Sequence, residues 1–217
     1  MIEKKCSVSV CDFEIDDGGK KEKKKLRKES NVCKGIEFLE RIAKKNYPQI
    51  TYSVWKFLYE SEKVKKIKFI EGRYYEDVLF STEVLLCTER IAYINEALYY
   101  YTIRNTSITK TNVTDKHIED LLIVLDLQNE LIEKKEKEVP KWIIEHYFWQ
   151  CIDLKMRSLE LEQKRKWLAI INSKIKQKNI TYESMSEKTI KNFVKYVLAR
   201  YGINLYVYVL RWMKQEK

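Results

Sequence analysis

The sequence predicts an α+β fold that is mostly helical, with short strands confined to the first half of the chain. The chain has 217 residues but only 5 Gly and 2 Pro, too few for the many turns of a β-sandwich or barrel. Apolar residues alternate near the N-terminus and later recur every three or four positions, which are the periods of strand and helix. We therefore expect a strand-containing region at 1–110 and an all-helical C-terminal region at 111–217.

The first region opens with a predicted strand at 7–15, which alternates loosely and is rich in Val and Phe. The sequence DDGG that follows predicts a turn, because Asp and Gly tolerate a positive φ. The basic run at 20–28 is interpreted as a solvated loop, with a phosphate or membrane contact as the alternative.

Periodicity and turn residues predict further elements in this region. One helix begins near Lys34 and ends before Pro48. The other predictions are a short helix at 51–59, an apolar run at 67–70, a helix at 76–89, and two strands at 91–94 and 98–104.

Five helices are predicted for the second region, where apolar residues form wide stripes at helical spacing. They are expected at 117–134, 142–161, 166–175, 187–201 and 205–213. Many aromatic residues lie within these segments, interleaved with lysines. Such a mixture can stack on nucleic-acid bases, but the aromatics follow the helical period, so packing in a core or interface is the favoured interpretation.

The formal net charge of +10 is open to two interpretations. A basic surface suits nucleic acid or a membrane, whereas lysines spread along a sequence are typical of a solvated surface. Because the positive charge is dispersed apart from the run at 20–28, we favour the solvated surface.

Cysteine and histidine usage argues against disulfides and zinc. The five cysteines are odd in number and form no C-x-x-C pair, which is typical of a reduced, cytoplasmic protein. His117 and His146 lie far from any cysteine cluster, so no zinc site is expected. The N-terminus shows no signal-peptide pattern, and no apolar stretch reaches membrane-spanning length. We therefore predict a cytoplasmic location, with peripheral contact at the inner face of the cell membrane left open.

The most informative stretch runs from Ser53 to Thr109 and contains SVWKFLY, IKFIEGRYYEDVLFSTEVLL and RIAYINEALYYYTIRNTSIT in that order. Four short groups of residues stand out in it: Trp55, Leu58 and Tyr59; Phe69, Glu71 and Gly72; Glu76 and Asp77; and Tyr99, Tyr100, Tyr101, Arg104 and Ser107. In order and spacing, these patterns resemble the later part of the catalytic domain in bacterial family 2 glycosyltransferases of the GT-A type. Those enzymes build capsules, exopolysaccharides and other surface glycans.

The resemblance implies inverting transfer of a sugar from a nucleotide-sugar donor to a saccharide or lipid-linked acceptor. By resemblance, Asp77 is the base that takes the proton of the acceptor hydroxyl, and Glu76 positions the acceptor or the base. Trp55, Arg104 and Ser107 are assigned to acceptor or phosphate binding in the same way. The competing interpretations are that Glu76 and Asp77 only cap a helix, and that Arg104 is a surface ion-pair partner.

The chain departs from the family pattern in two respects. Lys56-Phe57 stand where the family has Asn-Lys, so no contact is carried over to that pair. No glycine-rich or Asp-x-Asp element resembling the nucleotide and metal site occurs. The resemblance therefore implies that a nucleotide-sugar-binding half of about one hundred residues is missing, and with it the ligands for Mn²⁺ or Mg²⁺. This chain is accordingly expected to hold no cofactor and to be inactive alone, and an uncovered apolar face would favour a homodimer.

A second class of function stays open on the sequence. A basic helical module could bind nucleic acid, a membrane surface or a protein partner without catalysis. Salt-dependent retention on heparin or DNA distinguishes this alternative, because polyanion binding weakens steeply with salt.

Overall fold

The computed structural model describes residues 3, 5–17, 20–24, 31–44, 52–103, 112–136 and 138–215. The chain is a mixed α/β protein in which helices predominate, and this confirms the predicted fold class. It divides into two compact units. Unit 1 comprises Met1–Asn112 and Asp126–Lys137, and unit 2 comprises Val113–Leu125 and Glu138–Lys217.

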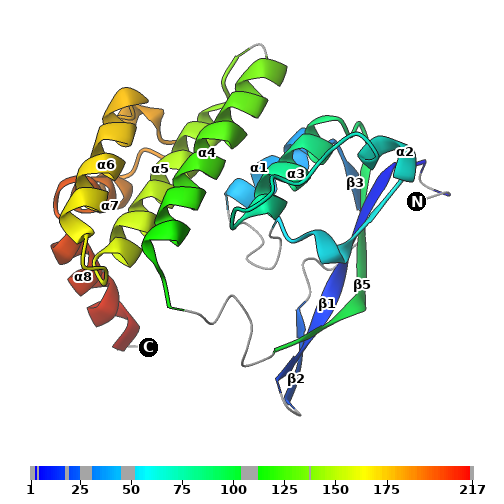
Figure 1. Cartoon of the computed structure of the whole chain (residues 1–217), viewed down its shortest axis with the longest axis horizontal. Coiled ribbons are helices and arrows are strands. Elements are labelled where there is room, and N and C mark those ends of the chain that lie inside the picture. Colours follow the sequence, from blue (N-terminus) through cyan, green and yellow to red (C-terminus); the bar gives the residue numbers. More distant parts are fainter. Residues whose placement is uncertain are drawn as a thin grey trace. The chain divides into compact units, whose positions relative to one another are not determined.

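A mixed five-stranded sheet forms the centre of unit 1 (Figure 1). Its long strands β1 (Val8–Asp17) and β5 (Ile91–Thr102) run parallel. Strand β3 (Asn31–Cys33) pairs antiparallel with β5. The other edge of β1 is shared, because β4 (Phe57–Tyr59) pairs with its first half and β2 (Lys20–Lys24) with its second half.

Strand β5 replaces the two separate strands predicted at 91–94 and 98–104. Its first part pairs with β1 up to Cys11 and Ile94, the register then shifts on both sides of Asp12, and pairing resumes at Phe13 and Tyr99. The residues between the two predicted strands, 95–97, thus form an irregularity within one strand. Sequence periodicity detects the interruption but not the common partner strand that keeps both halves in line.

Two other predictions for unit 1 are wrong because strands form along β1 where a loop and a helix were predicted. Residues 20–24 of the predicted loop form β2, which pairs antiparallel with β1 from Phe13 to Asp17. The helix predicted at 51–59 is a short 3₁₀ turn at Val54–Lys56 followed by β4. In both cases the edge of β1 supplies backbone hydrogen-bond partners that local propensity does not reveal.

Helices α1 (Gly35–Ala43) and α3 (Glu76–Leu86) cover one face of this sheet, with the short α2 (Ser61–Val64) beside them. Their buried apolar side chains meet β4: Phe38 lies 6.1 Å from Phe57, and Phe80 lies 5.8 Å from Tyr59, between ring centroids. The helices themselves touch at Gly35, whose amide donates to the carbonyl of Thr88 at 2.9 Å. A Cβ at position 35 would lie 1.9 Å from the Leu85 carbonyl oxygen, so only glycine fits.

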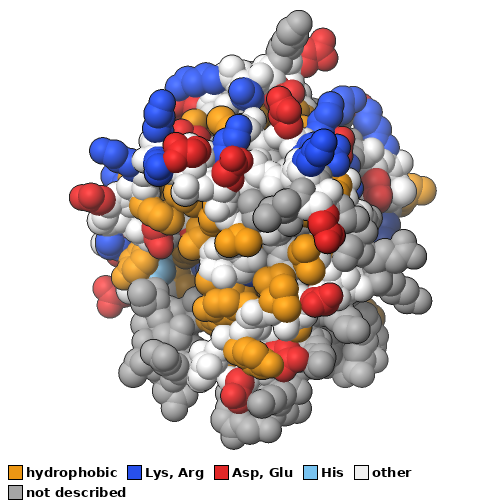
Figure 2. Space-filling model, turned by 90° about the vertical axis from the view of Figure 1, so that its right-hand side faces the viewer, with side chains coloured by type: hydrophobic (Ala, Val, Ile, Leu, Met, Phe, Trp, Pro, Cys, Tyr) orange, Lys and Arg blue, Asp and Glu red, His pale blue; other side chains and the backbone are white. Residues whose placement is uncertain are grey.

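Apolar side chains also remain exposed on unit 1. The side on which Figure 1 draws β1, β5 and α2 faces the viewer in Figure 2, where hydrophobic side chains gather in the middle below a group of Lys and Arg. Leu58 of β4 and Leu98 and Tyr100 of β5 are each more than 60% exposed.

Unit 2 is helical and contains α5 (Lys141–Ser158), α6 (Lys164–Gln177), α7 (Ile190–Tyr201) and α8 (Ile203–Gln215). The long helix α4 (Asp115–Lys135) contributes its first part to unit 2 and its last part to unit 1. All five helices predicted for the second region are confirmed, with ends that shift by at most three residues. Phe148 and Tyr196 stack at 4.9 Å between ring centroids and join α5 to α7 in the core.

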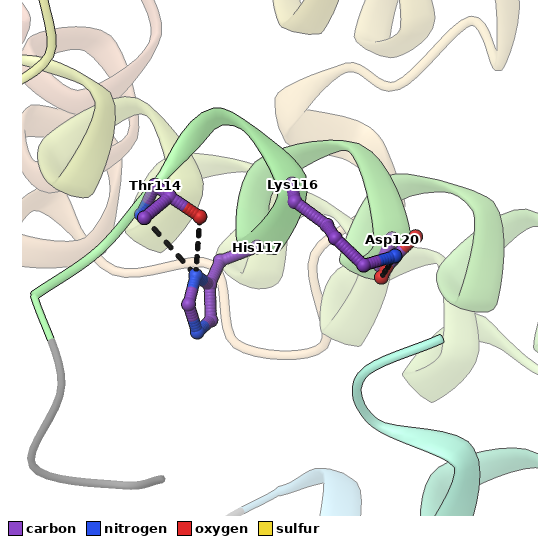
Figure 3. Close-up of polar contacts among 4 residues, drawn as sticks. All are labelled: Thr114, Lys116, His117 and Asp120. Atoms are coloured by element: carbon purple, nitrogen blue, oxygen red, sulfur yellow. Dashed lines mark hydrogen bonds and ion pairs between the residues drawn. The ribbon is translucent and has the colours of Figure 1, made fainter. Parts of the chain in front are cut away.

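The start of α4 is fixed by polar contacts, which Figure 3 shows. The backbone amide of Thr114 donates to Nδ1 of the buried His117 at 3.2 Å, and the Thr114 hydroxyl contacts the same atom at 2.8 Å. Nδ1 is therefore a hydrogen-bond acceptor, and the other ring nitrogen carries the proton. One turn on, Lys116 forms an ion pair with the buried Asp120 at 2.8 Å. His117 thus stabilises a helix start.

The described helices include none that combines the length and apolarity needed to cross a membrane. All five cysteines are free thiols.

Candidate active site

The predicted catalytic pair lies at the first turn of α3. Glu76 and Asp77 are the first two helical residues. The residue before them, Tyr75, has a φ of 64°, in the left-handed region that non-glycine residues rarely adopt. Such backbone strain is common at functional sites, and here it directs the chain into the helix that carries the two carboxylates.

The half-buried Asp77 has a raised pKa. Burial of the carboxylate is the largest cause, and the charge of Glu76 adds to it. The backbone amides of Val78 and Asp77 and the ammonium of Lys56 act in the opposite direction. A carboxylate with a raised pKa holds an abstracted proton more readily than an ordinary surface acid, which is the property a general base needs.

Lys56 is the main feature of the site that sequence reasoning missed. Its side chain is 2% exposed, and burial lowers its pKa to about 7, opposed by electrostatic interactions with Cys11, Asp77 and Asp12. The Cys11 thiol in turn donates to the Lys56 carbonyl at 3.5 Å. The available signal was a lysine inside the otherwise apolar run SVWKFLY, at the position where the chain departs from the family pattern.

Asp12 is a second buried charge that the sequence reasoning did not single out. Its side chain is fully buried, and the Tyr93 hydroxyl donates to its Oδ1 at 2.8 Å. Asp12 lies at the register shift between β1 and β5, and its charge acts on Lys56. The structure therefore brings Asp12, Lys56 and Asp77 into one electrostatic network in which the lysine interacts with both carboxylates.

Trp55 lies in an aromatic cluster on the sheet. Its ring stacks on Tyr99 and Tyr101 of β5, at 4.5 and 5.2 Å between centroids, and meets Phe13 of β1 edge-on at 5.0 Å. The Lys56 ammonium lies 5.8 Å from the Trp55 ring. This stack holds the segment containing Lys56 against β1 and β5. The half-buried Trp55 is thus fixed beside the charged network that includes Asp77.

Two predicted site residues, Arg104 and Ser107, lie outside the described residues, so the structure does not place them relative to Asp77. The part of the chain that the structure describes contains no group of three or more His, Cys, Asp or Glu residues able to hold a metal ion.

Comparison with known proteins finds a curated relative and a solved structure to which the chain is similar. The uncharacterized glycosyltransferase YibD of Escherichia coli (strain K12) is 34% identical over 62 residues, which is 28% of this chain and 18% of YibD. The crystal structure of S. aureus TarS 1-349 in complex with UDP-GlcNAc matches with a TM-score of 0.67 at 19% identity. The match covers 100% of this chain and 62% of the TarS chain.

The chain is glycosyltransferase-like in sequence and in fold. The sequence likeness is limited to a short segment, and the TarS likeness is one of fold. No protein-family model matches the chain. The chain spans less than two thirds of the length of either protein.

Proposed function

We propose that this chain is the acceptor-side part of an inverting GT-A glycosyltransferase of family 2, with Asp77 as the catalytic base. The observation that carries the proposal is the position of Asp77. It is the second residue of a helix whose N-cap is the strained Tyr75, has a raised pKa, and interacts with the buried Lys56. A helix cap needs neither burial nor a buried cation beside it. The glycosyltransferase-like fold supports the assignment.

The proposed reaction exchanges one bond at the anomeric carbon for another and moves one proton. An acceptor hydroxyl oxygen attacks the anomeric carbon of the donor sugar as the Asp77 carboxylate takes the hydroxyl proton. The bond from the anomeric carbon to the nucleotide diphosphate breaks, and the diphosphate leaves with the bonding electron pair. Glu76 adds negative charge beside Asp77 and raises its pKa, which makes Asp77 a better proton acceptor.

Lys56 has an electrostatic role in this scheme. Its ammonium lowers the pKa of Asp77, which keeps the carboxylate ionised and ready to accept a proton near neutral pH. Trp55, fixed on Tyr99 and Tyr101, is proposed to contact the acceptor. Arg104 and Ser107 are proposed to contact acceptor or phosphate, as expected from the sequence.

The donor-binding residues and the divalent cation are proposed to belong to a part of the protein outside this chain. Bound Mn²⁺ or Mg²⁺ would neutralise charge on the leaving diphosphate. Residues 1–110 would then supply the acceptor side of the catalytic domain, and residues 111–217 its helical C-terminal region. The acceptor is proposed to be a saccharide or a lipid-linked glycan of bacterial surface polysaccharide, reached from the cytoplasm. TarS was crystallised with UDP-GlcNAc, so UDP-sugars are the first donors to test.

A transfer assay tests the proposed activity. The complete protein that contains this chain is incubated with Mn²⁺, a panel of radiolabelled nucleotide-sugars and glycan acceptors extracted from bacterial envelopes. Label is expected to appear in acceptor with at least one donor, together with release of the nucleoside diphosphate. Failure of every donor to label acceptor, with the protein folded, would overturn the proposal. The 217-residue chain alone is expected to give no transfer.

A further inference from the structure

Helices α7 and α8 carry apolar side chains on two sides. One set is buried and fastens the helices to unit 2, and it includes Tyr196 and Tyr206. The other set is exposed to an unusual extent for large apolar residues. Its exposed fractions are 85% for Ile190, 50% for Val194, 77% for Tyr201, 54% for Leu205, 68% for Tyr208 and 53% for Trp212.

The exposed side chains follow the helical period rather than being scattered. On α8, Leu205, Tyr208 and Trp212 are spaced three and four residues apart and form one stripe. On α7, Ile190 and Val194 are four residues apart. We call these two sets together the α7–α8 stripes. Exposed apolar stripes of this kind mark an interaction site.

Within α7 and α8 the charged residues are all basic, whereas the exposed Glu187 lies just before α7. From Ile190 to Trp212 the sequence contains four basic residues and no Asp or Glu, although the whole chain has 32 acidic residues among 217. Lys191 and Arg211 are exposed. Apolar residues combined with basic ones on the same two helices favour an anionic partner.

The exposed side of α7 is held outward, because α7 is fixed on its other side. The buried Lys155 of α5 donates from Nζ to the carbonyls of Ala199 at 3.1 Å and Arg200 at 3.0 Å, at the end of α7. The Tyr196 hydroxyl donates to the Ile180 carbonyl at 3.2 Å. The exposed side is therefore a stable feature of the folded unit.

From these observations we propose that the α7–α8 stripes dock on the surface of an anionic lipid bilayer. Helix α8 has 13 residues, about 20 Å of helix, too short to span a hydrocarbon core of about 30 Å. It would instead lie along the surface, with Leu205, Tyr208 and Trp212 at the boundary between headgroups and acyl chains. Tyr and Trp suit this boundary because their rings are apolar and their edges polar. Lys191 and Arg211 would face headgroup phosphates.

Vesicle flotation with the full 217-residue chain tests this surface. Vesicles of phosphatidylcholine alone are compared with vesicles of phosphatidylcholine mixed with phosphatidylglycerol, at low and high salt. The chain is expected to float with the anionic vesicles, less so at high salt, and hardly at all with the neutral ones. The triple change Leu205→Ser, Tyr208→Ser and Trp212→Ser is expected to lower the partition coefficient by about tenfold or more.

Matched variants distinguish docking by the α7–α8 stripes from non-specific binding through other exposed apolar residues and from the proposed sugar transfer. The double change Leu58→Ser and Leu98→Ser removes equally exposed apolar side chains from unit 1 and is expected to float like the wild type. Asp77→Asn is expected to float normally, because docking does not depend on the proposed catalysis. Circular dichroism checks that each variant is folded.

Several outcomes would overturn the proposal. They are failure of the wild type to float with anionic vesicles, equal flotation of the triple variant, and equal loss of flotation in the unit 1 control. A dimer in light scattering that the triple change converts to monomer, without vesicle binding, would assign the stripes to self-association instead. Salt-sensitive retention on DNA without vesicle binding would assign the surface to nucleic acid.

Discussion

The buried Lys56 ammonium and the Asp77 carboxylate act on each other across unit 1: the lysine lowers the pKa of the carboxylate, and the carboxylate raises that of the lysine. Burial opposes ionisation of both groups. Each group is thus charged partly because the other is present. This mutual dependence links the stability of the fold to the chemistry proposed for Asp77.

Replacing Lys56 by Met is expected to stabilise the protein most at neutral pH and progressively less as the pH rises. In the folded protein the pKa of Lys56 is about 7, and in the unfolded chain it is about 10.4. Between these values the unfolded state binds more protons, so the wild-type free energy of unfolding rises with pH through this window. Methionine does not titrate, so the free energy of unfolding of the variant lacks this rise with pH.

Urea unfolding at several pH values from about 7 to about 10 measures the difference between the two proteins. Lys63→Met, a change at an exposed lysine of α2, is the control and is expected to show a difference that hardly varies with pH. A difference between wild type and the Lys56 variant that is constant over this range would contradict the burial of a charged lysine.

The same Lys56→Met change is expected to move the acid limb of the activity profile to higher pH. Below about pH 7 the wild-type lysine is largely protonated and lowers the pKa of Asp77. Without it, Asp77 is protonated at a higher pH and loses its function as a base there. The measurement is kcat/KM of the complete protein as a function of pH. An unchanged acid limb would show that Lys56 does not act on the catalytic base.

Gly35→Ala is expected to destabilise unit 1 by about 3 kcal/mol or more, because the new methyl group overlaps a backbone carbonyl and the backbone must shift. The clash is with the Leu85 carbonyl oxygen at 1.9 Å. Gly202→Ala provides the control, since a Cβ there meets the nearest atom at 3.5 Å. Equal midpoints of chemical denaturation for the two variants would contradict the close approach of α1 and α3.

Tyr93→Phe is expected to lower the free energy of unfolding by about 1–3 kcal/mol, because it removes the hydroxyl that donates to the buried Asp12. Denaturant unfolding measures the loss. Tyr208→Phe removes a hydroxyl from an exposed side chain and is expected to change stability little. If the two changes lower the free energy of unfolding equally, the hydrogen bond to Asp12 makes no net contribution to stability.

The helices of unit 2 were predictable because their apolar spacing is strong and local. Helix α4 was expected at 117–134 and spans Asp115–Lys135. Residues 51–59 show the limit of this reasoning. Trp55, Leu58 and Tyr59 suit one side of a helix, but pairing of the segment with β1 imposes a strand, in which Leu58 faces solvent. Tertiary partners decided between two patterns that the sequence allows.

Only some residues of the candidate site could be predicted from the sequence. Glu76 and Asp77 could be singled out from a pattern and from their place at the start of a helix. Lys56 and Asp12 could not, because their importance comes from burial beside each other, and burial of a charge depends on residues distant in the sequence. The usable signal was a charged residue within an apolar run, which alone predicts neither burial nor partner.

Sugar transfer by the Asp77→Asn variant of the complete protein tests the central claim most directly. Asparagine keeps the shape of the side chain but cannot accept the acceptor proton. We expect the rate of transfer to fall by about a hundredfold or more, while the circular dichroism spectrum and the affinity for the nucleotide-sugar stay as in the wild type. Transfer at the wild-type rate would contradict the assignment of Asp77 as the base.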